Sequence, residues 1–289
     1  MNNYSRTVLA CLVAVGLSAC GGGGSSDSTG SVSSNLPPPP PPPPASQSPG
    51  GVWTVQYVVQ SGANAGDTID GRALVTEAGD VFFAEINTVN HCALIGFGQV
   101  TVNGSAATGS TNDALVTFSQ NPLVNTSCSF PDGSTSATST LSGTVTQRSA
   151  FTLTDTSTTS LGMALGSGTN TWSYSNLYAE TPSLATIAGN YADNSNTLTV
   201  SSNGAIFEQD PNTGCVINGQ ASIVNPSYNA YSVSYTFASC TGNAAVLNGT
   251  TAKGLGYYDD TVNPIEIVYG VHATVNGQAF VLAGTLSKM

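Results

Sequence analysis

Apolar and polar residues alternate with a period of two along much of the C-terminal half of the chain. In the clearest stretch the apolar positions are Tyr231, Val233, Tyr235 and Phe237. The positions between them are Ser232, Ser234 and Thr236. Because successive side chains of a strand point to opposite faces, this pattern predicts a half-buried strand with rings on one face and hydroxyls on the other.

Asn-Gly pairs predict two hairpin turns. Val271–Val275 and Gln278–Leu282 flank Asn276-Gly277, and Asn203-Gly204 separates two further apolar runs. Both residues of such a pair tolerate the positive φ angles of a type I′ turn. Other strands are predicted at residues 197–201, 205–209, 221–224, 245–253 and 265–270. Seven to nine short strands without a convincing helix predict an antiparallel barrel or sandwich of about 100 residues, which protects its strand edges by closure or packing.

Four blocks recur in the same order in the two halves of the chain. Leu74–Phe82 matches Thr199–Phe207, Cys92–Gly96 matches Cys215–Gly219, Cys128 matches Cys240, and Leu141–Thr144 matches Leu247–Thr250. Gly51–Trp53 and Gly189–Tyr191 would open the two copies. We therefore predict an all-β chain of two tandem small antiparallel β-barrels, or sandwiches, related by internal duplication. Domain 1 would span residues 51–180 and domain 2 residues 185–289, joined near Thr181–Leu184.

The N-terminus has the anatomy of a secretory leader. Arg6 precedes an apolar run that is too short to span a membrane, and Leu17-Ser18-Ala19-Cys20 follows it. These four residues resemble the lipobox of bacterial lipoproteins. The resemblance implies that residues 1–19 are a signal peptide and that Cys20 carries a diacylglycerol thioether and an acylated amino group, of which palmitate is typical. Gly21 after the anchor implies sorting to the outer membrane, with the leaflet left open. An ordinary secretory signal is the alternative.

Residues 20–50 predict a tether. They are rich in Gly and Ser and then contain an unbroken proline run, Pro37–Pro44, with no apolar periodicity that could build a core. The prolines favour a stiff polyproline II rod that rises about 3.1 Å per residue. A docking site for an aromatic-lined groove is the alternative interpretation.

The cysteine count predicts two disulfides. Cys11 leaves with the signal peptide and Cys20 takes the lipid, so an even number remains for an oxidising compartment. Repeat symmetry pairs the remaining four as Cys92 with Cys128 and Cys215 with Cys240. Each disulfide would contribute roughly 3 to 4 kcal/mol. A redox or zinc role is disfavoured because the chain has no C-x-x-C and no zinc-ligand spacing.

Composition narrows the classes of partner. The formal net charge is −11, and only 7% of residues are charged. This charge would repel a polyanion, so we expect no nucleic-acid partner. Transmembrane barrel strands need about 9 to 11 residues and aromatic girdles. The predicted strands are mostly shorter and the chain ends without a closing aromatic residue, which disfavours a pore.

No catalytic, cofactor or metal site is predicted. His91 and His272 are the two histidines, and neither falls in a recognisable catalytic setting. No G-x-S-x-G elbow, phosphate loop or dinucleotide fingerprint occurs. Asp259-Asp260 and Asp210–Gly214 are the densest groups of oxygen ligands, but they lack the spacing of a calcium loop. We expect them to be capped turns, and we expect a protein that is not an enzyme.

The mature chain resembles largely uncharacterised proteobacterial outer-membrane lipoproteins that have duplicated β domains. The resemblance lies in the Gly-rich start after the lipobox, in G-C-x-x-x-G at Gly214–Gly219 and in P-S-L-A-x-x-x-G-x-Y at Pro182–Tyr191. The first copy departs from it, with His91 in place of the glycine before the cysteine. The resemblance implies architecture and location but no activity.

The function we expect is a non-enzymatic binding or envelope-interaction module anchored in the outer membrane. Its partners would be the membrane, through the lipid, and an envelope or extracellular protein or glycan. The alternatives are a structural or shielding surface lipoprotein, a barrel like those of periplasmic lysozyme inhibitors, and a hydrolase with an unusual site. An interior cavity in either barrel is the feature that would discriminate among them.

Overall fold

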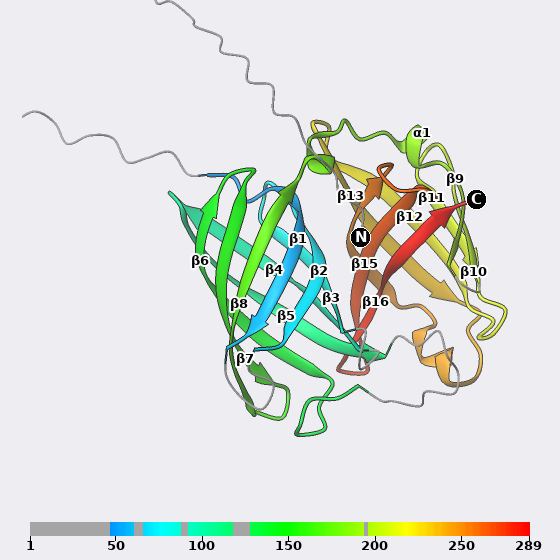
Figure 1. Cartoon of the computed structure of the whole chain (residues 1–289). Coiled ribbons are helices and arrows are strands. Elements are labelled where there is room, and N and C mark those ends of the chain that lie inside the picture. The colour runs from blue at the N-terminus through cyan, green and yellow to red at the C-terminus, as the bar shows by residue number, and fades with distance from the viewer. Residues whose placement is uncertain (1–46, 61–65, 88–91, 118–127, 194–195) are drawn as a thin grey trace, which may run out of the picture. The chain divides into compact units, whose positions relative to one another are not determined.

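The computed structural model describes residues 47–60, 66–87, 92–117, 128–193 and 196–289, and these form two closed antiparallel β-barrels of eight strands each (Figure 1). The first barrel comprises β1 (Gly51–Val59), β2 (Thr68–Val75), β3 (Asp80–Asn87), β4 (Cys92–Asn103), β5 (Ala106–Thr117), β6 (Ser136–Thr146), β7 (Ala150–Thr159) and β8 (Ala164–Ser175). The second comprises β9 (Gly189–Asp193), β10 (Asn196–Val200), β11 (Ala205–Gln209), β12 (Val216–Asn225), β13 (Tyr228–Ala238), β14 (Thr251–Asp259), β15 (Glu266–Val275) and β16 (Gln278–Lys288). The prediction of an all-β, two-barrel chain is confirmed.

In each barrel, strands that are consecutive in the sequence pair with each other. The first barrel closes where β1 pairs with β8, and the second closes where β9 pairs with β16. Closure pairs the edge strands, which would otherwise offer free backbone groups to other chains. Within the described residues, three short helical segments lie outside the strands: η1 (Asn176–Ala179), α1 (Leu184–Ile187) and η2 (Gly242–Leu247).

The duplication is visible in the turn between the second and third strands of each barrel. In the first barrel Gly79 has a φ of +90°, its N–H donates to the Thr76 carbonyl, and its own carbonyl accepts from Val100 N–H. Gly204 repeats this turn in the second barrel with a φ of +83°. Its N–H donates to the Ser201 carbonyl, and its own carbonyl accepts from Ala221 N–H. The match between these blocks is therefore confirmed.

Two details of the sequence prediction are wrong. Asn203-Gly204 is not a type I′ turn, because only Gly204 of the pair has a positive φ; the Ser201 N–H donates to the Ala205 carbonyl around a longer loop that ends in this glycine. The strand predicted at residues 245–253 is also wrong, since η2 occupies its first part. As a result Leu247–Thr250 lies ahead of β14, whereas Leu141–Thr144 lies within β6, and these two blocks are not equivalent.

The remaining turn and cysteine predictions are confirmed. Asn276 and Gly277 have φ angles of +51° and +79°, and Val275 pairs with Gln278 across them. The structure forms the disulfides Cys92–Cys128 and Cys215–Cys240, one in each barrel.

Each barrel has its own apolar interior, built from alternate positions of its strands. In the first barrel Trp53 packs edge-to-face on Phe151 at 4.9 Å between ring centroids, and Phe151 packs in the same way on Trp172 at 5.7 Å. Both tryptophans are nearly fully buried. A separate cluster joins outward-facing residues of the two barrels, including Phe82, Phe97, Leu255 and Val268.

Polar contacts accompany this shared cluster. Arg72 on β2 forms an ion pair with Asp259 on β14, with 3.3 Å between Nη1 and Oδ2. His272 on β15 stacks on Phe97 on β4 at 4.5 Å between ring centroids. The outer faces of these strands are therefore partly covered within the chain.

We predict that Gly79→Ala destabilises the protein much more than Gly133→Ala. Both glycines have positive φ angles, which cost an alanine about 1 to 2 kcal/mol. Only at Gly79 would the new methyl group also lie 2.0 Å from a backbone oxygen, that of Val100, whereas at Gly133 nothing lies within 4 Å. Urea unfolding followed by circular dichroism measures the difference, and equal losses in the two variants would refute this account of the turn.

Candidate functional site

The first barrel contains a cavity of about 580 Å³. Its lining includes residues at one end of the barrel, such as Val59, Ile69, Leu115 and Ala164. The opposite end is packed by large apolar side chains, among them Trp53, Val75, Val81, Val145 and Phe151. The barrel is therefore a cup with a packed floor and a hollow upper half, and its volume falls within the range of small-molecule sites.

Three carboxyl groups line this cavity, each from a different strand. They belong to Glu85 on β3, Asp113 on β5 and Asp155 on β7. Each lies two residues along its strand from an inward-facing neighbour, as Glu85 does from Phe83 and Asp155 from Leu153. Their exposed fractions are 4%, 3% and 8%, so all three carboxyls are held inside the barrel.

A chain of hydrogen bonds connects two of these carboxyls across three strands. The Ser139 hydroxyl donates to Asp113 Oδ2 and lies 2.7 Å from the Ser157 hydroxyl, which in turn lies 3.1 Å from Asp155 Oδ2. Asn170 Nδ2 donates to Asp155 Oδ1 at 3.4 Å. Ser139 and Ser157 are directly paired residues of β6 and β7, so the strand register itself creates the chain.

Several polar atoms in this wall have no hydrogen-bond partner within the described part of the protein. They are Asp113 Oδ1, Asn170 Oδ1, Thr111 Oγ1 and Trp172 Nε1. All four residues line the cavity and are buried. A buried polar atom without a partner costs about 1 to 3 kcal/mol, so a ligand that supplies partners would gain from these atoms.

Burial raises the pKa of all three carboxyls. Burial raises the pKa of Glu85 to about 8, and the nearby charges of Asp155 and Asp113 add to the shift. Burial also raises the pKa of Asp113 to about 6, against the opposing effect of the Ser139 hydrogen bond. The Thr111 hydroxyl lies close enough to lower this pKa, but its geometry falls short of a hydrogen bond. The pKa of Asp155 is raised for the same reason of burial.

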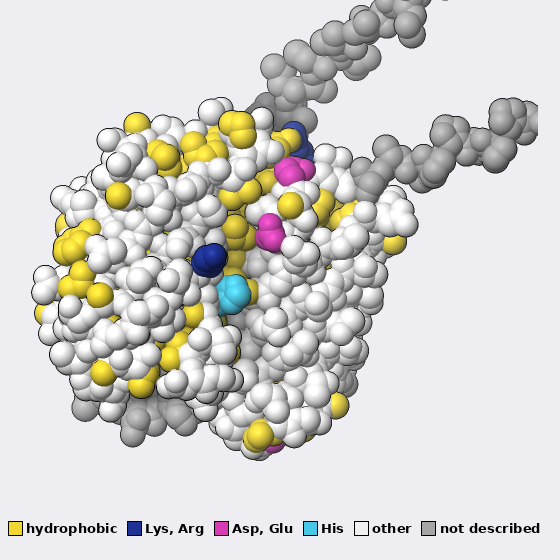
Figure 2. Space-filling model, turned by 180° about the vertical axis from the view of Figure 1, so that it is seen from behind, with side chains coloured by type: hydrophobic (Ala, Val, Ile, Leu, Met, Phe, Trp, Pro, Cys, Tyr) yellow, Lys and Arg dark blue, Asp and Glu magenta, His cyan; other side chains and the backbone are white. Residues whose placement is uncertain are grey.

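No lysine or arginine lines the cavity among the described residues, so no cation of the protein faces the three carboxyls. The Tyr57 hydroxyl is the remaining titratable group beside them, and burial raises its pKa, with contributions from Asp155 and Glu85. The outer surface differs from this interior. Figure 2 shows one face on which charged side chains are few and uncharged ones dominate.

The second barrel has aromatic rings where the first has Thr111 and Asp113. Val81 and Ile206 each follow the matched turn glycine by two residues, and they pair with Gly98 and Gly219 on the next strand. Gly98 pairs in turn with Thr111, whereas Gly219 pairs with Tyr235. Phe237, two residues further along β13, therefore stands at the position of Asp113, and both rings are buried in the interior. The blocks predicted to match at the first cysteines, Cys92–Gly96 and Cys215–Gly219, are two residues out of this register.

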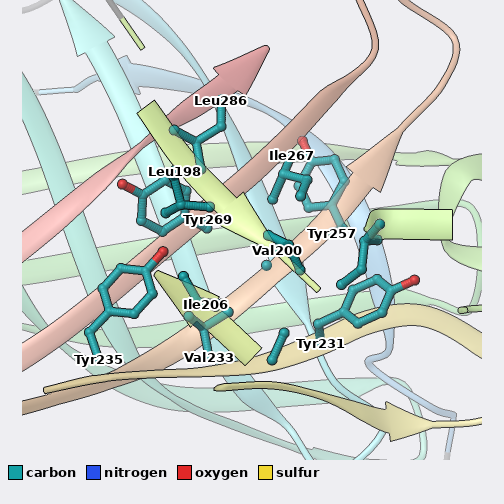
Figure 3. Close-up of a pocket in the computed structure, with 13 residues that line it drawn as sticks. Leu198, Val200, Ile206, Tyr231, Val233, Tyr235, Tyr257, Ile267, Tyr269 and Leu286 are labelled. Carbon is teal, nitrogen blue, oxygen red and sulfur yellow. The ribbon is translucent and has the colours of Figure 1, made fainter. Parts of the chain in front are cut away.

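The same comparison holds on the far wall. Carrying the pairing across two further strands places Val271 at the position of Asp155 and Tyr269 at the position of Leu153. In Figure 3, Tyr235, Tyr269 and Leu198 crowd the interior of the second barrel, where the cavity is only about 30 Å³. Rings at the positions of Thr111, Asp113 and Leu153 thus account in part for one barrel being hollow and the other filled.

The residues singled out by sequence lie elsewhere. His91 and Cys20 are outside the described residues. His272 faces outward, stacks on Phe97, has a pKa lowered by burial, and does not line the cavity. Asp210 accepts from Asn212 N–H at 2.8 Å and from the Thr213 hydroxyl at 2.6 Å, which is a capped turn.

Asp259 binds Arg72 and accepts from Thr261 N–H, so it also has a local partner. No group of three or more His, Cys, Asp or Glu residues with metal-binding geometry occurs in the part of the chain that the structure describes.

Sequence reasoning missed Glu85, Asp113 and Asp155. A signal was present, because Glu85 is in phase with Val81 and Phe83, and Asp155 is in phase with Phe151 and Leu153. An acid at an inward position of a period-two pattern indicates either an internal partner or a functional interior.

Comparison with family models, with curated proteins and with solved structures found no match. Among the described residues, no helix has the length and apolar character needed to cross a membrane.

We predict that the protein becomes less stable as the pH rises from about 5 to about 8.5. The pKa of Glu85 is higher in the folded than in the unfolded protein, so the unfolded state releases this proton at a lower pH. The free energy of unfolding therefore falls as the pH rises, until the folded carboxyl also ionises near pH 8. Glu85→Gln should flatten the dependence, because an amide stays neutral. Urea unfolding at a series of pH values tests this, with Asp70→Asn on the exposed face of β2 as control. An unchanged pH profile in Glu85→Gln would contradict the assignment.

Proposed function

We propose that this chain is a lipid-anchored binding protein whose first barrel encloses a small amphipathic molecule. The observation that carries the proposal is the cavity of about 580 Å³, lined by both aromatic rings and buried polar groups with unused hydrogen-bonding capacity. Sites that bind small molecules combine a mostly apolar wall with a few polar groups that fix orientation.

The polar groups of the cavity favour binding over turnover. Burial raises the pKa of Glu85, Asp113 and Asp155, and the hydroxyls of Ser139 and Ser157 are hydrogen-bonded to the two aspartates. His272 does not line the cavity, and its ring is stacked on Phe97. These features support a non-enzymatic role.

The location we propose is the outer membrane, with Cys20 as the lipid attachment site and residues 20–50 as the spacer. This part of the proposal depends on the lipobox resemblance at Leu17–Cys20. Two or three acyl chains would be needed for stable anchoring, since one chain binds only marginally. A membrane-held cup could capture its ligand close to the envelope, and the ligand-free alternative, a purely structural surface protein, does not call for a polar interior.

Cavity binding predicts that a neutral polarity-sensitive dye, N-phenyl-1-naphthylamine, gains fluorescence with the purified protein. Ala137→Trp places an indole in the cavity and should weaken dye binding at least tenfold. Thr138→Trp is the matched control, because Thr138 is the next residue of β6 and faces solvent. Circular dichroism checks that both variants fold. Equal dye binding by the two variants, or no binding by the wild-type protein, would defeat the proposal.

The anchor predicts a mass increase at Cys20. Protein recovered from bacterial membranes should yield an N-terminal peptide that begins at Cys20 and carries a diacylglycerol and an amide-linked acyl chain. Cys20→Ser should release the protein from the membrane fraction. Detection of an unmodified Cys20, or of residues 1–19 still attached, would show that the anchor is wrong.

A further inference from the structure

We infer that the ligand of the first barrel is an organic cation, an amine with an apolar body, held by Asp113 and Asp155 with Glu85 beside them. This inference rests on the proposed function and specifies its ligand class. It follows from three observations: the polar atoms of the cavity are mainly acceptors, the protein places no cation against them, and the rest of the wall is apolar and aromatic.

The acceptors determine what the ligand must supply. Asp113 Oδ1 and Asn170 Oδ1 are buried, line the cavity and have no hydrogen-bond partner in the described structure. Both belong to the same bonded chain across β5 to β8, so they lie on one side of the barrel. An ammonium group has three donors and no acceptor, which matches such a wall. A carboxylate or phosphate ligand has no donor for these acceptors, and each ionised acid of the wall would repel it.

The hydrogen-bond chain shows where the charge comes from. The contacts Asp113–Ser139, Ser139–Ser157 and Ser157–Asp155 need three protons, but the two hydroxyls supply only two. For all three hydrogen bonds to form, one of the two carboxyls must be protonated. A bound ammonium favours the ionised form of both, so binding would release this proton from the carboxyl to the solvent.

The remaining wall fits an apolar or aromatic body. Tyr57, Phe83, Phe130 and Trp172 all line the cavity, together with Leu94 and Leu115. Rings near a carboxyl cluster also stabilise a cation through their faces. The formal net charge of −11 would attract a cation toward the protein and repel an anion.

Three probes of one shape and different charge test the inference. The full-length purified protein is titrated by isothermal calorimetry with 4-phenylbutylamine, 4-phenylbutan-1-ol and 4-phenylbutanoate at pH 7.5. We expect the amine to bind at least tenfold more tightly than the alcohol, and the carboxylate not to bind. Repeating the amine titration at pH 6.5 in two buffers of different ionisation enthalpy should reveal proton release. The affinity should rise between pH 5.5 and pH 8.5, because Asp113 and Glu85 ionise over this range while the amine stays charged.

Isosteric variants locate the charge. The combined change Asp113→Asn, Asp155→Asn and Glu85→Gln should reduce amine affinity to that of the alcohol and leave alcohol affinity unaltered. Asp70→Asn removes one acid from the exposed face of β2 and should leave the preference for the amine unchanged. If the combined variant loses its fold, Asp113→Asn alone is measured, and a smaller preference for the amine is expected.

The outcomes separate this inference from the proposed function. Dye binding without a preference for the amine overturns the cation and leaves a neutral ligand in the same cavity. Displacement of the amine by millimolar calcium would indicate a metal site and would also overturn it. Binding of neither the dye nor the amine overturns both proposals.

Discussion

Closure of eight antiparallel strands imposes the constraint on which the rest of this structure depends. Once a sheet is closed, every second residue of every strand faces the same interior, and those residues must together either fill it or line a space. A side chain at an inward position therefore cannot turn to the outer face of its strand. In this protein the constraint is applied twice to related sequences, with different results: a packed second barrel and a hollow first barrel.

The difference between the barrels lies in what the inward positions carry at matched register. Tyr235, Phe237 and Tyr269 bring bulk and fill the second interior, whereas the matched positions of the first barrel hold the smaller Thr111, Asp113 and Leu153. Buried acids are costly unless they are neutralised or hydrogen-bonded. The serines at paired positions of β6 and β7, together with the raised pKa values of the carboxyls, reduce that cost. The first barrel thus has a polar interior that is less densely packed, which is the pattern expected where residues needed for function reduce stability.

Most of the fold could be predicted from the sequence because local sequence patterns determine its strands and turns. Alternation over Tyr231–Phe237, the Asn276-Gly277 turn and the repeated cysteines each predict an element without knowledge of distant contacts. Prediction failed where local signals conflict, as at residues 245–253, where β propensity gave way to η2 and a connecting turn. The site was harder to predict. Asp113 and Asp155 are far apart in the chain, and only the register of β5, β6 and β7 brings them into one hydrogen-bonded chain.

The floor of the cup has a consequence for how the molecule can be observed. The chain has two tryptophans, Trp53 and Trp172, and both belong to the first barrel, whereas the rings of the second barrel are tyrosines and phenylalanines. Indole emission from the unlabelled protein therefore reports on one barrel alone, while its far-ultraviolet signal averages over both. Comparing the two signals during unfolding reveals whether the duplicated halves lose structure as one cooperative body or one after the other.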